Sequence, residues 1–235
     1  MHVLGIALDF GKMIQWLPTF FEGTLVTIVL SFMTVIIGSL LGLVATLMKQ
    51  SQNKLLKGIA AIYTQVIRGT PLLVQLFIWL YALPLIGLSL PALPFLGNTY
   101  GSREFVTAVI ALSINSGAYI CELLRGGLAS IDKGQMEAGR SLGLSKKETM
   151  QSVIIPQAIR VVIPGLGNEF IAMIKESSIV SVVGIFDVMY TSNIVKAATY
   201  SVFEPLIIVA LIYFVLTFTL TFLINRLEKR LNVYV

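Results

Sequence analysis

Polar residues interrupt several strongly apolar segments of this sequence, and they are the first candidates for contact with a small polar solute. Charged and amide groups inside such segments cost free energy unless they face a partner or water. Asn115, Tyr119 and Glu122 fall at i, i+4 and i+7, which places them along one side of a helix. The full candidate set is Arg68, Gly69, Thr70, Pro71, Gln75, Asn115, Tyr119, Glu122, Lys175 and Ser178.

The run from Gly69 to Pro71 predicts a helix start or break, where backbone amides and carbonyls become available to a ligand. A zwitterionic solute needs an acceptor for its ammonium group and donors for its carboxylate, and a helix discontinuity supplies both. Lys175 and Ser178 share a face of a later segment. These residues therefore suit a path for a small charged molecule.

Purely structural interpretations of the same residues stay open. Lys175 and Glu176 can pair with charges on neighbouring helices, and Glu122 can pair with Arg125 three residues on. Interhelical hydrogen bonds are the alternative for the two amide side chains, Gln75 and Asn115.

Residue patterns that would indicate catalysis are missing from the sequence. It has no Gly-rich phosphate loop followed by Lys, no Cys and His spacing suited to a metal, and a single His, which leaves no Ser/His/Asp set. It has no motif for reading DNA. We therefore expect a chain that is not an enzyme, holds no cofactor of its own and binds no nucleic acid.

The composition predicts an integral membrane protein. Of 235 residues 56% are hydrophobic and 12% charged, with a mean hydropathy of +0.88, so there are too few polar groups to cover a soluble globule. A membrane-spanning helix needs roughly 20 apolar residues. Five segments of about that length predict an all-α fold with five transmembrane helices: 23–48, 70–90, 105–124, 165–189 and 205–225. Gly38 and Gly42, in the first of them, favour close helix packing.

The positions of the 17 Lys and Arg residues orient these helices, because positive residues concentrate in cytoplasmic loops. An external N-terminus places thirteen of them inside: Lys49, Lys54, Lys57, Arg68, Arg125, Lys133, Arg140, Lys146, Lys147, Arg160, Arg226, Lys229 and Arg230. Only Lys12, Arg103 and Lys196 then lie outside. The N-terminus is predicted to be external, and the C-terminus and the loop at about 130–160 cytoplasmic.

The first 22 residues lack a basic start and a small-residue cleavage site, so we do not interpret them as a signal peptide. Phe10, Ile14, Leu17 and Phe21 recur at helical spacing, as in an amphipathic helix that lies in the outer membrane interface. The expected organisation is an interfacial segment at 1–22, a transmembrane domain at 23–228 and a cytoplasmic tail at 229–235.

The loop at about 130–160 carries helix-capping patterns. Asp132 with Gln135, and Ser145 with Glu148, match the N-terminal caps of two helices. Gly143 stands where a left-handed residue would end the first helix, and Pro156 is expected to close the second. The pattern favours a short amphipathic element docked on a partner, with apolar anchors at Ile131, Met136, Leu142 and Leu144 and exposed charges at Lys133, Arg140, Lys146 and Lys147.

The same loop resembles the EAA loop of binding-protein-dependent ABC importer permeases, which reads EAA, x3, G, x9, I, x, L, P. Here Glu137, Ala138 and Gly139 are followed by Gly143 and then by the sequence VIIP at 153–156. Gly139, Val153 and Ile155 depart from the pattern but keep its size class or apolar character. The resemblance implies contact with a cytoplasmic ATPase through Glu137, Ala138, Gly139, Leu142, Gly143 and Pro156.

A second block makes the resemblance more specific. Residues 68–75, RGTPLLVQ, resemble the start of the second span in the polar amino-acid branch of these permeases, the branch for histidine, glutamine, arginine and glutamate. Matching continuations follow at 122–127, 156–160 and 175–179, so the resemblance covers about 20–228.

Membership of this family implies a type I ABC importer permease for amino acids in a bacterial inner membrane. Its implied partners are a second permease subunit, identical or similar, an ATPase dimer that binds ATP and Mg, an extracytoplasmic amino-acid-binding protein, the amino-acid substrate and membrane lipid. Two other interpretations stay open: a type I importer for another small solute, and an ion-driven secondary transporter or channel. The inverted repeat typical of many secondary carriers is not visible.

Overall fold

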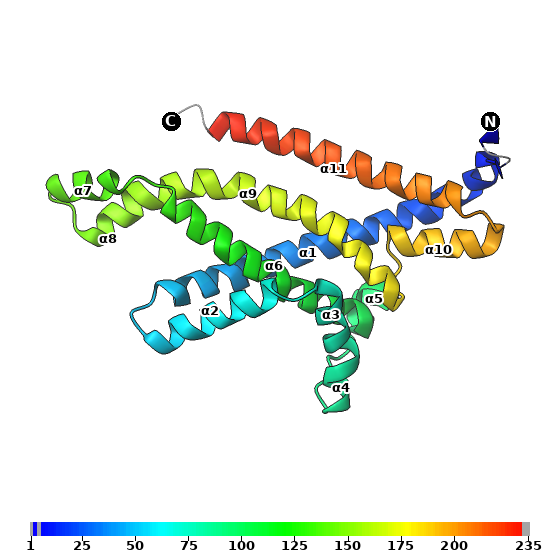
Figure 1. The fold of residues 1–235 in the computed structure, drawn as a ribbon, viewed down its shortest axis with the longest axis horizontal. Coiled ribbons are helices and arrows are strands. Elements are labelled where there is room, and N and C mark those ends of the chain that lie inside the picture. The colour runs from blue at the N-terminus through cyan, green and yellow to red at the C-terminus, as the bar shows by residue number, and fades with distance from the viewer. Residues whose placement is uncertain (1, 4–5, 232–235) are drawn as a thin grey trace. The chain divides into compact units, whose positions relative to one another are not determined.

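The computed structural model describes residues 2–3 and 6–231, and nearly all of them are helical (Figure 1). The chain begins with β1 (His2–Val3), which pairs antiparallel with β2 (Ile6–Ala7), then the 3-10 helix η1 (Phe10–Trp16), α1 (Leu17–Gln50) and α2 (Lys54–Arg68). Next come α3 (Leu72–Phe77), the π-helix η2 (Ile78–Ala82), α4 (Leu83–Leu85), the 3-10 helix η3 (Pro94–Leu96), α5 (Gly97–Tyr100) and α6 (Arg103–Ala129). The remainder holds α7 (Lys133–Ser141), α8 (Lys146–Thr149), the π-helix η4 (Met150–Ile154), α9 (Ile155–Glu176), the 3-10 helix η5 (Ser177–Val183), α10 (Val188–Thr199) and α11 (Phe203–Leu231).

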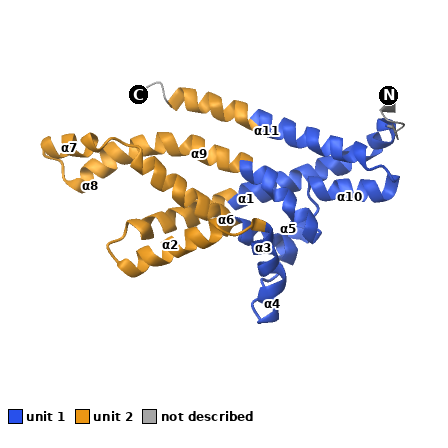
Figure 2. Cartoon of the chain, in the orientation of Figure 1, with its two compact units in different colours: residues 1–34, 73–112, 172–219 blue, residues 35–72, 113–171, 220–235 orange. Residues whose placement is uncertain are grey.

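The chain forms two compact units (Figure 2). Unit 1 comprises residues 1–34, 73–112 and 172–219, and unit 2 comprises residues 35–72, 113–171 and 220–235. Each unit joins segments that are far apart in the sequence, so each is held together by long-range packing.

Four helical stretches in the described part of the chain are long and apolar enough to cross a membrane: Phe10–Gln50, Arg103–Ala129, Lys146–Val183 and Phe203–Leu231. A fifth is counted if the broken pair Lys54–Arg68 and Leu72–Leu85 forms one span. The predicted segments 23–48, 105–124 and 205–225 lie inside three of these helices. The all-helical membrane fold is therefore confirmed, and five is the upper count.

The fourth predicted segment, 165–189, starts inside a longer helical stretch, but its predicted C-terminal limit is wrong. The helix begins at Lys146 and continues past Pro164, and its last part, η5, ends at Val183. Gly184 follows with a φ of 82°, a left-handed conformation that glycine adopts without steric cost and that stops the helix. Residues 184–187 are a connection, and α10 is a helix that the sequence analysis did not predict.

The predicted N-terminal amphipathic helix takes a different form. η1 begins after Asp9, whose side chain accepts from the Gly11 amide at 3.1 Å, and runs directly into α1. The four apolar residues on which that prediction rests, Phe10, Ile14, Leu17 and Phe21, are all exposed. Residues 1 and 4–5 of this segment, and 232–235 of the predicted tail, lie outside the described residues.

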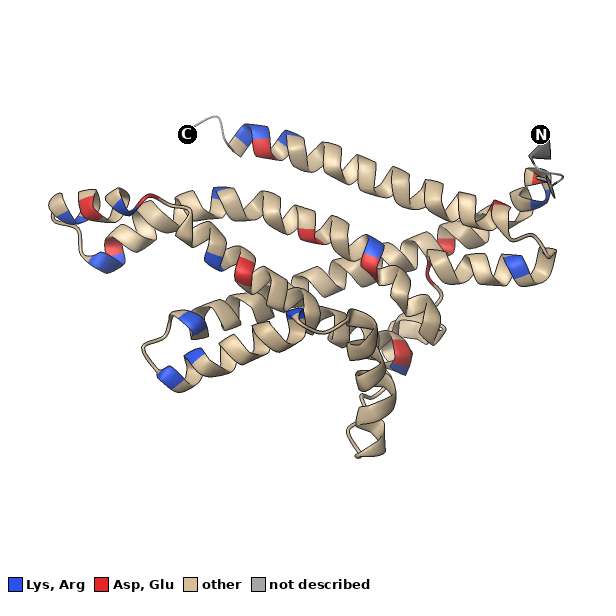
Figure 3. Ribbon diagram, in the orientation of Figure 1, with Lys and Arg blue, Asp and Glu red and all other residues tan. Residues whose placement is uncertain are grey.

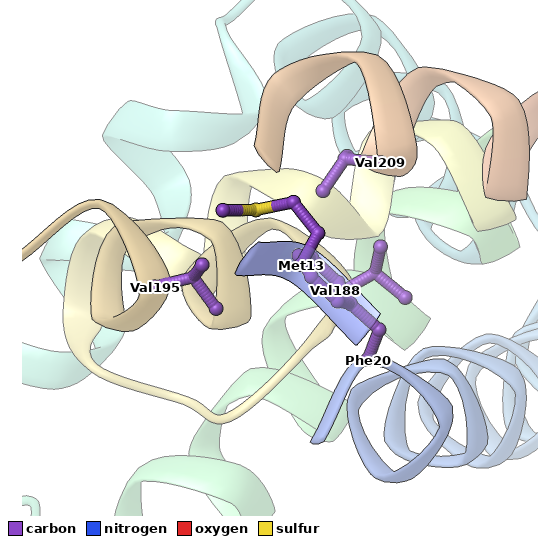
Figure 4. Close-up of a cluster of buried hydrophobic side chains, with 5 residues drawn as sticks. All are labelled: Met13, Phe20, Val188, Val195 and Val209. Atoms are coloured by element: carbon purple, nitrogen blue, oxygen red, sulfur yellow. The ribbon is translucent and has the colours of Figure 1, made fainter. Parts of the chain in front are cut away.

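A buried apolar cluster joins the N-terminal part of unit 1 to α10 and α11 (Figure 4). It consists of Met13, Phe20, Val188, Val195 and Val209, each 5% exposed or less. Polar contacts reinforce the same packing, because the Val188 amide donates to Thr27 Oγ1 at 3.2 Å and the Asp9 amide donates to Glu204 Oε1 at 3.0 Å.

Small residues allow α1 and α6 to pack closely in unit 2. A Cβ on Gly38 would lie 3.1 Å from the Ser116 side chain, and one on Gly42 would lie 2.8 Å from the Ile120 side chain. The prediction that Gly38 and Gly42 serve close helix packing is confirmed. Thr46 continues the contact by donating to the Cys121 carbonyl at 3.3 Å.

Candidate functional site

The loop between α6 and α9 folds into a helical hairpin at the tip of unit 2, formed by α7, a glycine turn and α8 (Figure 2). Asp132 caps the first helix, and its side chain accepts from the Gly134 amide at 2.5 Å. The predicted pairing with Gln135 takes another form, because the Gln135 amide donates to the backbone carbonyl of Asp132 at 3.1 Å. The cap prediction is thus confirmed for Asp132 alone.

Gly143 ends the first helix in the predicted left-handed conformation, with a φ of 89°. The Leu144 amide donates to the Gly139 carbonyl and the Gly143 amide to the Arg140 carbonyl, each at 3.1 Å. These two bonds form a Schellman motif, which satisfies carbonyls that a helix end otherwise leaves unpaired. The turn therefore has a defined geometry.

The second cap matches its prediction in full. The Glu148 amide donates to Ser145 Oγ at 3.2 Å, and the Ser145 amide donates to Glu148 Oε2 at 2.7 Å. This reciprocal arrangement is a capping box. It fixes the start of α8 immediately after the glycine turn.

Gly139, which stands where the related loops have alanine, lies at the contact between the two arms of the hairpin. A Cβ at this position would lie 2.5 Å from Thr149 Cγ2, which is closer than such atoms approach in proteins. Thr149 is fully buried. The departure from the EAA pattern therefore allows α7 and α8 to touch.

Pro156 does not close the second helix, so that prediction is wrong. It is the second residue of α9, and a continuous helical stretch runs from Lys146 to Val183. The π-helix η4 precedes it, and the Ile155 amide bonds five residues back to the Met150 carbonyl. A widened π turn accommodates the ring and the missing N–H group that would break a regular α-helix.

The hairpin presents its central residues outward. Glu137, Ala138 and Gly143 are exposed, and Leu142 is 83% exposed, an unusual state for a large apolar side chain. Ile131, Met136 and Leu144 are partly buried. The four charged residues predicted to be exposed are all exposed: Lys133, Arg140, Lys146 and Lys147. Figure 3 shows basic residues of unit 2 gathered on the hairpin and at the connection between α1 and α2.

Unit 2 also brings together two of the candidate solute-path residues. The guanidinium carbon of Arg68 lies 5.3 Å from the centre of the Tyr119 ring, in cation–π geometry. Arg68 ends α2, Gly69 caps that helix, and Thr70 Oγ1 donates to the Val66 carbonyl at 2.9 Å. The predicted helix break at Gly69 to Pro71 is confirmed.

Glu122 forms ion pairs with Arg125, the structural partner considered in the sequence analysis, and with Lys49. Arg125 Nε lies 2.9 Å from Glu122 Oε2, and Lys49 donates to the other carboxylate oxygen. Lys49 was not predicted, because it is 73 residues away in the sequence. Asn115, one turn before Tyr119, is buried. The same helix contacts α9 where Ser116 Oγ donates to Glu169 Oε1 at 2.7 Å.

The remaining candidates, Gln75, Lys175 and Ser178, belong to unit 1. Gln75 is buried on α3, Lys175 is exposed at the end of α9, and Ser178 is partly buried in η5. Within residues 2–3 and 6–231, Lys175 and Glu176 form no ion pair within 4.0 Å. The pairing considered for them is therefore absent from the described part of this chain.

Burial changes the acid–base behaviour of one carboxyl group outside the candidate spans. Asp187 is fully buried, caps α10 by accepting from the Tyr190 amide at 2.7 Å, and lies 3.5 Å from the Tyr213 hydroxyl. Loss of solvation raises the pKa of Asp187 to about 7, and the bonds it accepts oppose that rise.

Comparison with known proteins identifies the family. The family model described as binding-protein-dependent transport system inner membrane component matches residues 36–233. The chain belongs to this family. This match confirms the family that was predicted from the residue spacing at 137–156 and from residues 68–75.

Named relatives align with nearly the whole permease. The arginine transport system permease protein ArtQ of Bacillus subtilis (strain 168) is 41% identical over 226 residues, 96% of this chain and 98% of the relative. A putative glutamine transport system permease protein GlnP of Rickettsia bellii (strain RML369-C) is 40% identical over 213 residues, 90% of this chain and 92% of the relative.

A solved structure agrees with the fold. The chain superposes on a crystal structure of an amino acid ABC transporter with histidines at a TM-score of 0.88, with 45% identity, 96% of this chain and 100% of that chain covered. This permease is therefore a multi-pass inner-membrane component of an ABC transporter and not itself an enzyme.

Proposed function

We propose that the permease forms the translocation path of an ATP-driven amino-acid importer and that its α7–α8 hairpin is the contact for a cytoplasmic ATPase. The observation that carries this proposal is the hairpin itself, a rigidly capped element that presents Leu142 almost fully to solvent. An apolar side chain held outward on a defined turn is typical of a docking anchor. The relatives named for arginine and glutamine transport support an amino-acid substrate.

The proposed orientation has the N-terminus outside and the hairpin in the cytoplasm. If the pair Lys54–Arg68 and Leu72–Leu85 crosses as one broken span, the α1–α2 connection and the hairpin fall on the same side of the membrane. If it does not cross, their basic residues are divided between the two sides, against the usual inside excess of positive charge. Charge therefore favours five spans.

The assembly needs further chains. One hairpin per permease, working with an ATPase dimer, requires two permease copies or two similar subunits around a two-fold axis. The ATPases supply the bound ATP and Mg, and an extracytoplasmic binding protein delivers the amino acid. Closure of the ATPases moves the hairpins and switches the packed helices between discrete arrangements.

Arg68 and the break after it are the best-supported part of the proposed solute path. The guanidinium is exposed and stacked on Tyr119, so it is held in position while its N–H groups can bind a carboxylate. The interrupted backbone at Gly69 to Pro71 supplies nearby polar groups. Both features suit the zwitterionic end of an amino acid.

Uptake into proteoliposomes tests the proposal. The permease is reconstituted with its ATPase and binding protein, and uptake of each radiolabelled amino acid is measured with ATP, with ADP and with an imposed ion gradient alone. ATP-dependent uptake of at least one amino acid is expected. Uptake driven by the ion gradient without ATPase would contradict the proposal and show that the permease is a secondary transporter. ATP-dependent uptake of a different solute class, with no uptake of any amino acid, would contradict the proposed substrate.

A further inference from the structure

Unit 2 contains a large groove beside the hairpin, and its lining includes neither Leu142, the proposed ATPase anchor, nor any residue of the proposed solute path. Its volume is about 700 Å³, within the range of cavities that bind small molecules. It is lined by the C-terminal ends of α1 and α6, by α8 and η4, and by the start of α9. All of these segments belong to the same compact unit.

The groove is apolar at one end and polar at the other. Leu43 lies two helical turns before Gln50, the last residue of α1, and Val162 lies well inside the continuous helical stretch that starts at Lys146. Leucine, valine and isoleucine side chains dominate the inner part. The lining residues with long polar side chains lie at the other end, near the end of α1 and the start of α8: Gln50, Lys146, Lys147 and Gln151.

The polar end is positively charged. Lys146 and Lys147 are exposed and make no ion pair within 4.0 Å among residues 2–3 and 6–231. Thr46, the one hydroxyl in the lining, is already bonded to the Gly42 and Cys121 carbonyls at 2.7 and 3.3 Å. Ammonium groups therefore dominate the polar chemistry, and they favour an anionic group beside an apolar chain.

We propose that this groove binds an anionic glycerophospholipid, with one acyl chain along the apolar walls and the headgroup phosphate at Lys146 and Lys147. The walls come from three stretches that are long and apolar enough to cross a membrane. The proposal places their apolar part at the depth of acyl chains and the lysines at the depth of phosphates. Basic pockets between transmembrane helices bind anionic headgroups in this way.

Only the assignment to the cytoplasmic leaflet rests on the proposed orientation; the groove and its charge do not. Because Lys146 and Lys147 begin α8, the bound lipid would attach the hairpin to the membrane surface. Loss of lipid binding is also measured separately from transport or ATPase contact, so failure of one proposal is distinguishable from failure of the other.

The test is native mass spectrometry of the full-length chain in mild detergent, titrated with phosphatidylglycerol or phosphatidylcholine that carry the same acyl chains. The wild type is expected to bind phosphatidylglycerol about tenfold more tightly. Lys146→Gln with Lys147→Gln should reduce that preference to about twofold or less. The matched control, Lys54→Gln with Lys57→Gln, changes two exposed lysines outside the groove and should retain the preference.

A second pair of variants tests the apolar walls. Ile159, an exposed wall residue, is replaced by Trp to fill the groove, and Ile62→Trp enlarges an exposed isoleucine elsewhere in unit 2. Ile159→Trp should weaken binding of both lipids, and Ile62→Trp should leave it unchanged. Equal affinity of the wild type for the two lipids, or equal losses in test and control variants, would overturn the proposal.

The identity of the occupant is read by a photo-crosslinking amino acid placed at Leu47, an exposed residue of the groove wall. Crosslinks in native membranes are expected on phospholipid. Crosslinks mainly to a second copy of the chain, or to another protein, would show that the groove is a protein interface and would contradict the lipid assignment.

Discussion

Ser145 and Glu148 cap each other across the first turn of α8, with the Glu148 amide 3.2 Å from Ser145 Oγ and the Ser145 amide 2.7 Å from Glu148 Oε2. Both groups are exposed, so the box acts locally and does not depend on a buried core. It fixes the start of the second arm of the hairpin directly after the Gly143 turn.

Replacement of Ser145 by Ala should loosen this arm. Loss of an N-cap costs about 1 kcal/mol, so amide hydrogen exchange at Glu148 and Thr149 should accelerate about fivefold. Ser152→Ala, at an exposed position in η4, is the control and should leave exchange unchanged. Equal exchange rates in wild type and Ser145→Ala would show that the box does not stabilise the hairpin.

Gly42→Ala tests the close packing of α1 on α6. The added Cβ would lie 2.8 Å from Ile120 Cγ2 and 2.9 Å from the Gly117 carbonyl oxygen. Overpacking of this kind costs about 1–3 kcal/mol, and the melting temperature in detergent should fall by several degrees. Gly126→Ala, where no atom lies within 4 Å of the added Cβ, should not lower it; a similar fall in both variants would refute the packing argument.

The Lys49–Glu122 pair should be energetically coupled. Both side chains are less than 20% exposed, so removal of one leaves a poorly solvated charge. A double-mutant cycle with Lys49→Met and Glu122→Gln, followed by thermal unfolding, should give a coupling of about 1 kcal/mol or more. Arg125 is 56% exposed and should couple more weakly to Glu122. Additive effects of the Lys49 and Glu122 changes would count against the pair.

Asp187 makes stability depend on pH. Its folded pKa of about 7 lies above the ordinary value of 3.8, so the folded chain holds the proton more tightly than the unfolded chain. This contribution to stability is fully present below the ordinary pKa and is lost as the pH rises through about 7. The melting temperature should therefore fall across this interval in the wild type and fall less in Asp187→Asn, which cannot ionise but retains the capping oxygen. Identical pH profiles would contradict the assignment.

Local features of the hairpin could be predicted because their causes lie within a few residues. The Ser145 cap and the Gly143 turn depend on neighbouring backbone groups, and both were expected from spacing alone. Pro156 was misjudged because its usual effect assumes a regular α-helix, whereas the π turn before it shifts the hydrogen bonds. Such a shift leaves no simple mark in the sequence.

Contacts between distant segments could not be predicted in the same way. The stripe of Asn115, Tyr119 and Glu122 was visible, but its partners Arg68 and Lys49 come from other helices. Arg68 and Tyr119 were both candidates without any indication that they touch. Which polar residue meets which depends on the rotation and crossing of packed helices, and periodicity along one helix does not determine these.

Co-purification with the ATPase tests the central claim most directly. The permease carries an affinity tag, is expressed with its cytoplasmic ATPase, and is compared with Leu142→Glu and with Leu55→Glu, which changes another exposed leucine at the start of α2. We expect the wild type and Leu55→Glu to retain the ATPase and Leu142→Glu to lose it. Without the ATPase, all three permeases should elute at the same size in gel filtration. Full retention of the ATPase by Leu142→Glu would contradict the role proposed for the hairpin.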